Sequence, residues 1–192
     1  MVFFTFKDQI HFMKALLVID MQQGSFTAAT PRYDAEGVVA RINKLAAAFR
    51  SNDDIVVFIR HDGSAQGDFI PSTAEWELLP ELQMIKDVDT SLGKTANDCF
   101  YRSDLGAFLE TRGIRELVIT GCATDFCVDS TIKAALGKDY HITVIADGHT
   151  TADRPGIAAA QVIDHYNWIW QNMLPTQGSL RVCPAAHYLE RF

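Results

Sequence analysis

The chain of 192 residues is 48% hydrophobic and 21% charged, a composition typical of one soluble globular domain. Its formal net charge of -7 gives no electrostatic reason to expect a nucleic acid or a membrane as a partner, and no apolar run is long enough to cross a bilayer. The four cysteines match neither a disulfide framework nor a zinc-binding pattern, which favours reduced thiols and a cytoplasmic location.

Strands and helices are predicted to alternate along the chain. Short continuous apolar runs indicate strands buried on both faces, and apolar residues at helical spacing indicate the helices between them. The predicted strands are 15–20 (ALLVID), 55–60 (IVVFIR), 117–120 (LVIT), 142–146 (ITVIA) and 180–183. The predicted helices are 34–50 with Asp34 as N-cap, 103–112 ended by Gly113, about 125–136 ended by Gly137, and a last helix to about 173 with Pro155 near its first turn.

This alternation predicts a parallel sheet covered by helices on both faces, in a single α/β domain over residues 14–192. Residues 1–13 are expected to be an N-terminal extension. The segment 61–89 is rich in Gly, Pro, Ser and acidic residues, which is typical of a long functional loop.

Three polar residues deserve comparison because parallel sheets bind ligands beyond the carboxyl ends of their strands. Asp20 directly follows the first strand, where a turn or cap role is the simpler interpretation. Cys127 follows a strand and a glycine turn and falls in a first helical turn, where N–H groups and the helix dipole are expected to lower a thiol pKa and to bind an oxyanion. Packing as a small buried residue is the alternative for Cys127. Lys94 matters only if it approaches these two residues.

Four segments, taken in order, resemble the isochorismatase-like cysteine hydrolases, a superfamily that includes nicotinamidases and related amidases. They are 16–22 (LLVIDMQ); Lys94 followed by 98–100 (DCF) and 103–105 (SDL); 121–131 (GCATDFCVDST); and 144–147 (VIAD).

The resemblance implies a six-stranded parallel sheet in a three-layer α/β/α sandwich that assembles as a homodimer or larger homo-oligomer. It implies that Asp20, Lys94 and Cys127 form the catalytic triad. It also implies a cis peptide between Cys122 and Ala123, and an oxyanion hole made by the backbone N–H groups of Ala123 and Cys127. The activity expected is hydrolysis of a C–N bond in a small amide or ureide through a thioester.

The sequence also departs from two members of that family. Nicotinamidases carry a metal site after the second strand, and 60–64 (RHDGS) lacks its ligand set, so we expect no metal or other cofactor and no nicotinamidase activity. His61 and Asp62 are interpreted as residues of the loop or the pocket wall. True isochorismatases cleave a vinyl ether without a cysteine nucleophile, so that reaction is one alternative, and a non-catalytic binding module on the same fold is another.

The topology also suggests residues for the substrate pocket. The candidates are Gln22, Phe26, Trp76, Phe100, Tyr101, Phe126 and His165. Trp168 and Trp170 are expected in the core or at a subunit interface, and Cys99 and Cys122 are expected to be small core residues.

Overall fold

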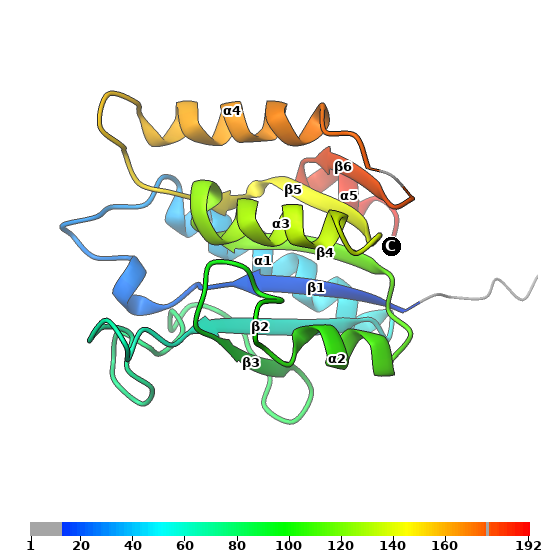
Figure 1. The fold of residues 1–192 in the computed structure, drawn as a ribbon, viewed down its shortest axis with the longest axis horizontal. Coiled ribbons are helices and arrows are strands. Elements are labelled where there is room, and N and C mark those ends of the chain that lie inside the picture. The colour runs from blue at the N-terminus through cyan, green and yellow to red at the C-terminus, as the bar shows by residue number, and fades with distance from the viewer. Residues whose placement is uncertain (1–12, 176) are drawn as a thin grey trace, which may run out of the picture.

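The computed structural model describes residues 13–175 and 177–192, so all but the last residue of the expected N-terminal extension lies outside the described chain. Figure 1 shows a central sheet with helices in front of it and behind it. The strands are β1 (Lys14–Ile19), β2 (Ile55–His61), β3 (Thr90–Lys94), β4 (Glu116–Cys122), β5 (His141–Thr150) and β6 (Ser179–Cys183). The helices are α1 (Ala35–Ser51), α2 (Leu105–Thr111), α3 (Asp129–Leu136), α4 (Ala159–Gln171) and α5 (Ala185–Leu189), with the short turns η1 (Gln23–Ser25) and η2 (Thr124–Val128).

The six strands form one parallel sheet in the order β3-β2-β1-β4-β5-β6. The chain first builds outward from β1 to β3, then returns to the other side of β1 and builds outward to β6. The strand order therefore reverses between the neighbouring strands β1 and β4. Open parallel sheets bind ligands at such a point, beyond the carboxyl ends of the strands. The predicted α/β fold with a six-stranded parallel sheet is confirmed.

Each central strand buries both of its faces, as its continuous apolar sequence requires. Successive side chains of a strand point to opposite faces, so Leu17 and Ile19 of β1 join a core beneath α2, α3 and α4. Leu16 and Val18 join a second core beneath α1 and α5. The two cores on either side of one sheet establish three layers.

Several element boundaries differ from the sequence-based predictions. The segment ending in Lys94 is an edge strand, β3, that pairs with β2, although its sequence TSLGK has little apolar character. The last long helix begins at Ala159, and Pro155 lies before it in a turn closed by the bridge between Arg154 and Ile157. A proline suits that turn as well as a helix start, so its position was misinterpreted.

Asp34 stands at the predicted N-cap position without capping the helix, whereas the predicted long loop is present. Asp34 is the N-cap residue of α1, but its backbone is left-handed with a φ of 48° and its carboxylate pairs with Arg41 instead of capping the helix. The predicted loop 61–89 begins one residue early, because His61 ends β2, and residues 62–89 contain no helix and no multi-residue strand, as expected.

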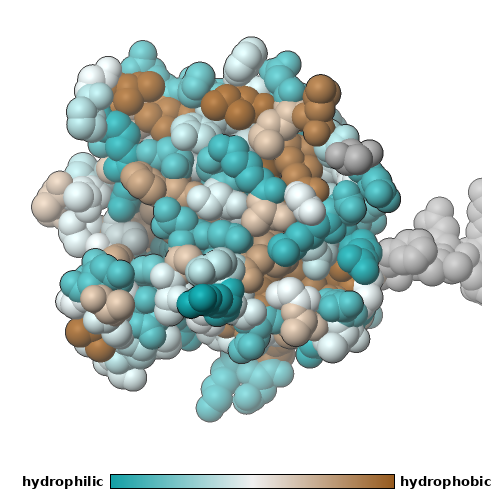
Figure 2. Space-filling view, viewed as in Figure 1, coloured by the Kyte–Doolittle hydropathy of each residue, from teal (hydrophilic) through white to brown (hydrophobic). Residues whose placement is uncertain are grey.

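The outer surface mixes polar and apolar residues, and Figure 2 shows apolar ones over the face that α4 covers. In and just after α4, Trp168 is 62% exposed and Leu174 is 95% exposed, whereas Trp170 is fully buried. Trp170 therefore lies in the core, whereas Trp168 does not, and a place at a subunit interface stays a prediction for Trp168. No helix in residues 13–175 and 177–192 is long and apolar enough to cross a membrane.

Candidate active site

Asp20, Lys94 and Cys127 come from three different elements and meet at the carboxyl edge of the sheet. Asp20 is the residue after β1, Lys94 ends β3, and Cys127 lies in η2 after β4. The backbone of Asp20 has a φ of 48°, a left-handed conformation that aspartate tolerates better than most residues. Its N–H donates to the carbonyl of Ile59 on β2 at 2.9 Å, which holds this carboxylate at the strand end.

Lys94 joins the other two side chains. Its Nζ lies 2.6 Å from Oδ2 of Asp20 and 3.3 Å from Sγ of Cys127, and it donates to the carbonyl of Ala96 at 2.9 Å. Lys94 is 2% exposed and Asp20 is 5% exposed. Burial by itself lowers the pKa of Lys94, but the carboxylate of Asp20 and the nearby Cys127 more than offset this effect, so its pKa is raised above the ordinary value.

The pKa of Cys127 moves in the direction opposite to the one expected from its place in a helical turn. Burial raises it, the carboxylate of Asp20 raises it further, and the ammonium of Lys94 offsets only part of this. The expected lowering of the Cys127 pKa is therefore wrong, because desolvation and a facing carboxylate outweigh the dipole of one short turn. Before reaction, Cys127 is therefore a neutral thiol. Its S–H donates to Oδ1 of Asn97, with 3.6 Å between sulfur and oxygen.

The turn that carries Cys127 depends on Gly121. Its φ is +123°, and a Cβ there would lie 2.2 Å from the carbonyl oxygen of Ile19, so only glycine lets β4 end this close to β1. The peptide bond between Cys122 and Ala123 is cis. The carbonyl of Ala123 accepts from Phe126 N and from Val128 N, the second being the wide hydrogen bond of a π-type turn. The predicted helix at 125–136 is thus a π turn followed by α3.

A neutral polar network supports this turn from inside the protein. On β5, Nδ1 of His149 lies 2.9 Å from the hydroxyl oxygen of Thr124, and Nε2 of His149 lies 3.1 Å from Oδ1 of Asn167. Because Asn167 donates its Nδ2 to the carbonyl of Ala146, its oxygen accepts from Nε2–H, and Nδ1 then accepts from Thr124. Complete burial lowers the pKa of His149 to about 4, so this network carries no charge at neutral pH.

A cavity of about 250 Å³, the carboxyl-edge cavity, opens over these residues. Its lining consists of Asp20, Ser25, Arg32, His61, Phe69, Asn97, Cys122, Ala123, Phe126, Cys127 and Arg154. Of the predicted pocket residues, only Phe126 is among them. His61 lines it as a wall residue, whereas the Asp62 carboxylate accepts from the backbone of Ser64.

The other six predicted pocket residues do not line this cavity, and the physical reason differs for each. Gln22 is fully buried and hydrogen-bonds the backbone of His61 and Trp76, so it ties the loop down. The ring of Trp76 stacks against the guanidinium of Arg60 at 4.1 Å. Phe26 lines a separate cavity beside α1.

The remaining three do not line the carboxyl-edge cavity either. Phe100 packs against Tyr140 with ring centroids 5.6 Å apart, and Tyr101 is 52% exposed. His165 lies on the exposed side of α4, where its ring stacks on Trp168.

The two other cysteines near the site are core residues, as expected. Cys99 is 1% exposed and Cys122 is 2% exposed, and burial raises the pKa of each thiol to about 12. Neither is ionised at neutral pH. Cys122 and Cys127 both line the cavity, and Cys127 is the one of these two whose sulfur lies 3.3 Å from the Lys94 ammonium.

Sequence reasoning missed Asn97, Arg32 and Arg154. All three lie in loops that follow strands at the carboxyl edge, and that position was the available signal. A charged loop residue is more often solvated than functional, so only the folded chain distinguishes these. In residues 13–175 and 177–192, no group of three or more His, Cys, Asp and Glu side chains is placed to hold a metal ion.

Comparisons with known proteins agree on one family. A family model described as the isochorismatase domain matches residues 14–166. A streptothricin hydrolase from Streptomyces noursei is 32% identical over 79% of this chain and 54% of the relative, so the chain spans about half the length of that protein. An Arabidopsis thaliana protein described as a probable inactive nicotinamidase is 33% identical over 80% of this chain and 88% of its own length.

Two further likenesses come from an amidohydrolase and from a solved structure. A ureidoacrylate amidohydrolase from Variovorax paradoxus is 29% identical over 80% of this chain and 73% of the relative. A crystal structure of an isochorismatase family protein is 28% identical, with a TM-score of 0.79 over 87% of this chain and 96% of that chain.

Proposed function

Because the chain belongs to the isochorismatase family, we propose that it is a cysteine hydrolase that cleaves a C–N bond of a small amide or ureide through a thioester on Cys127. The observation that carries the proposal is the contact of Lys94 with both Asp20 and Cys127 at the base of the carboxyl-edge cavity. The amidohydrolase relative, which is named for a ureido substrate, supports the choice of bond.

The first half of the reaction begins with a neutral thiol, since the pKa of Cys127 is raised by burial and by Asp20. The Asp20 carboxylate takes the thiol proton as the sulfur attacks the carbonyl carbon of the substrate. The tetrahedral oxyanion accepts hydrogen bonds from the N–H groups of Ala123 and Cys127. Asp20 then gives its proton to the leaving nitrogen, the C–N bond breaks, and an acyl thioester remains on Cys127.

In the second half, Asp20 removes a proton from a water molecule that attacks the thioester carbonyl. Collapse of the second intermediate breaks the C–S bond, returns the proton to sulfur and releases a carboxylic acid or carbamate. Lys94 stays protonated throughout, because its pKa is raised by Asp20 and Cys127. Its role is to hold the Asp20 carboxylate against the thiol and to stabilise the sulfur anion as it forms.

The test separates acylation from turnover. Protein is mixed with p-nitrophenyl acetate, a general acyl donor, and quenched in acid for intact-mass and peptide analysis. In parallel, a panel of small amides and ureides is screened for released ammonia. We expect a single acetyl group on Cys127, ammonia release by the wild type, and at least about a 10³-fold loss of both in Cys127→Ala.

Cys183→Ala is the matched control, because Cys183 is a buried cysteine of β6 that does not line the carboxyl-edge cavity. It is expected to acylate and turn over as the wild type does. Acylation spread over several cysteines, or ammonia release that survives in Cys127→Ala, would contradict the proposal. Absence of both acylation and turnover would favour the non-catalytic binding module, and cleavage of a vinyl ether without acylation would favour isochorismatase-type chemistry.

A further inference from the structure

The carboxyl-edge cavity is lined by two arginines besides Asp20 and Cys127 of the proposed catalytic group. Arg32 lies in the loop between η1 and α1, and Arg154 lies in the loop between β5 and α4. Both guanidinium groups act electrostatically on the buried thiol of Cys122. Burial raises the pKa of this thiol, and the charges of the two arginines offset part of that rise. Since Cys122 immediately precedes Ala123, the two charges act at the end of the cavity where the scissile carbonyl would be held.

Arg154 is held rigidly and its charge is compensated. Its Nε and Nη2 donate to the two carboxylate oxygens of Asp125 at 2.7 and 3.0 Å, and Nη2 also donates to the hydroxyl of Thr151 at 2.7 Å. The same hydroxyl donates to Asp125 at 2.7 Å, and the guanidinium lies 5.0 Å from the ring centre of Phe126. This arrangement fixes one wall of the cavity without leaving a net charge on it.

Arg32 is different, because no carboxylate neutralises it within residues 13–175 and 177–192. Its Nε donates to the carbonyl of Ser25 at 2.6 Å, and that bond anchors the side chain at the cavity wall. The guanidinium is half-buried, and its Nη groups make no recorded hydrogen bond or ion pair with any described residue. Because the side chain is only half-buried, these Nη donors are accessible to an anion that enters the cavity.

His61 adds a neutral polar group to the same cavity. Burial lowers its pKa and the Lys94 ammonium lowers it further, so the ring is uncharged at neutral pH. Its Nδ1 is buried and has no hydrogen-bond partner among the described residues. This nitrogen is therefore a second group on the cavity wall that is available to a polar atom of a ligand.

Counting charges shows what the ligand must carry. Asp20 is paired with Lys94, and Asp125 is paired with Arg154, which leaves the single positive charge of Arg32. The cavity of about 250 Å³ also lies below the range of about 300–1,000 Å³ typical of pockets for drug-sized ligands. A small monoanion fits both the charge and the volume.

We propose that the substrates of this site are small amides or ureides that carry a carboxylate, and that Arg32 binds this carboxylate while Arg154 and Phe126 shape the wall beside it. The inference rests on the proposed function for the identity of the bond that is cleaved. The planar fork of a guanidinium matches a carboxylate through two parallel hydrogen bonds, which a neutral amide in the same place cannot reproduce.

The experiment compares two pairs of ligands that differ only in this group: succinamate against succinamide, and 3-ureidopropionate against 3-ureidopropionamide. We expect wild-type kcat/KM to favour the carboxylate of each pair by about 10–150-fold, the range for a hydrogen bond to a charged group. In Arg32→Gln the ratio is expected to fall to within about threefold of unity, whereas Arg32→Lys keeps part of it. Arg41→Gln, on the surface of α1, is the control that keeps the full ratio.

A binding measurement makes the test independent of turnover. Succinamate and succinamide are titrated calorimetrically into Cys127→Ala and into Cys127→Ala combined with Arg32→Gln. Tighter binding of succinamate that depends on Arg32 supports the carboxylate site, and it does so even where hydrolysis fails and the proposed function falls. Equal binding of the two ligands, or no binding of succinamate, overturns the carboxylate site even where both compounds are hydrolysed.

Discussion

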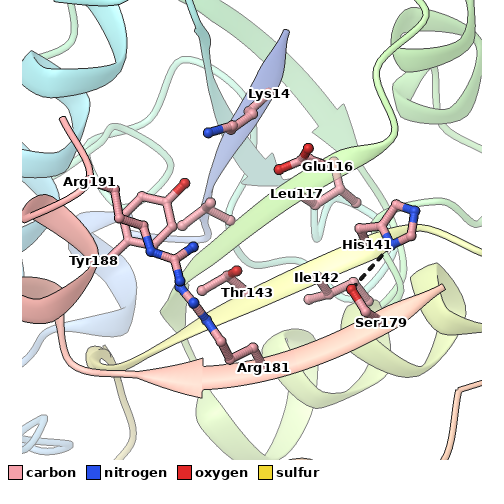
Figure 3. A pocket seen from close by; sticks show the side chains of 11 residues that line it. Lys14, Glu116, Leu117, His141, Ile142, Thr143, Ser179, Arg181, Tyr188 and Arg191 are labelled. Atoms are coloured by element: carbon pink, nitrogen blue, oxygen red, sulfur yellow. Dashed lines mark hydrogen bonds between the residues drawn. The ribbon is translucent and has the colours of Figure 1, made fainter. Parts of the chain in front are cut away.

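The sheet has a cavity at each end of its strands, and the larger one lies opposite the proposed catalytic group. The amino-edge cavity, at the starts of β1, β4, β5 and β6, measures about 360 Å³, against about 250 Å³ for the carboxyl-edge cavity. Figure 3 shows its lining, which comprises Lys14, Glu116, Leu117, Val118, His141, Ile142, Thr143, Ser179, Arg181, Tyr188 and Arg191. Both cavities are therefore lined by a histidine, two arginines and a carboxylate, and each has a lysine, which lines the amino-edge cavity (Lys14) or pairs with the lining carboxylate of the carboxyl-edge cavity (Lys94).

The difference lies in how the charged groups meet. At the carboxyl edge, Lys94 is fully enclosed and contacts both a carboxylate and a thiol within 3.3 Å. At the amino edge, Lys14 is half-buried, and its Nζ lies 6.0 Å from the ring centre of Phe192. Charges that are buried against each other have strongly altered proton affinities, whereas charges facing water do not, so burial and pairing identify a reactive site better than volume does.

The largest expected contrast is between the two carboxylates, Asp20 and Glu116. In Asp20→Asn we expect hydrolysis to fall by about 10²–10⁴-fold, because the proton acceptor is lost. Alkylation of Cys127 by iodoacetamide near pH 8 should instead become faster, because Asp20 raises the pKa of Cys127 and its removal leaves Lys94 to favour the thiolate. The measurements are ammonia release and intact mass against time.

Glu116→Gln at the amino edge is the matched control and should change neither rate by more than about twofold. Slower alkylation in Asp20→Asn would mean that proton removal by Asp20 outweighs the effect of its charge on the thiol. The expectation that Asp20 mainly suppresses thiolate formation would then be wrong.

A second contrast is between the two lysines. Lys94→Met leaves the Asp20 carboxylate buried without its partner, and we expect a loss of about 3–5 kcal/mol in the free energy of unfolding. Lys14→Met should cost less than about 1 kcal/mol, because the ammonium is half-buried and forms no ion pair with any residue in 13–175 and 177–192. Urea denaturation at pH 7 measures both, and equal losses would show that the ion pair is no more important to stability than the amino-edge lysine.

The smallest effect concerns the two histidines and acid stability. The pKa of His149 is lowered to about 4 in the folded protein, so the unfolded chain binds a proton first as the pH falls below about 6.5. Stability present above that pH should be lost progressively toward pH 4, by about 2 kcal/mol between pH 7 and pH 5.

Urea denaturation at the two pH values tests this expectation. His149→Gln should lose this part of the acid sensitivity, although its stability at pH 7 falls because Thr124 and Asn167 lose their shared partner. His141→Gln, at the amino edge of the same strand, should keep the wild-type pH dependence. If His149→Gln is as acid-sensitive as the wild type, another group is responsible, and the half-buried His61 is the next to test.

Sequence patterns predicted most of the sheet, including the edge strand β6, but not the opposite edge strand, β3. The runs ALLVI, IVVFI and LVIT are apolar throughout because both faces of these strands are buried, and this character is visible without a structure. Strand β3 was missed because TSLGK lies at the edge, where one side meets solvent and selection for apolar residues is weak. Its membership of the sheet is nevertheless what brings Lys94 beside Asp20.

Pocket prediction by proximity in sequence failed for a similar reason. Gln22 is two residues from Asp20, but the chain turns inward there and Gln22 ends fully buried against loop backbone. Arg32 and Arg154 are 12 and 134 residues from Asp20, yet both reach the carboxyl-edge cavity. Distance along the chain says little about a cavity that several separate loops enclose.

The sequence by itself determined the alternation of strands and helices, the parallel sheet, and the motifs that place Asp20, Lys94 and Cys127 in the order typical of one family. These features are local, because hydrophobic periodicity and glycine turns act over a few residues. Only the tertiary structure decided that the pKa of Cys127 is raised, that no carboxylate of the described part of the chain pairs with Arg32, and that His149 supports the turn as a neutral group. Those properties depend on desolvation and on distances between charges, and both are set by elements that meet only when the chain has folded.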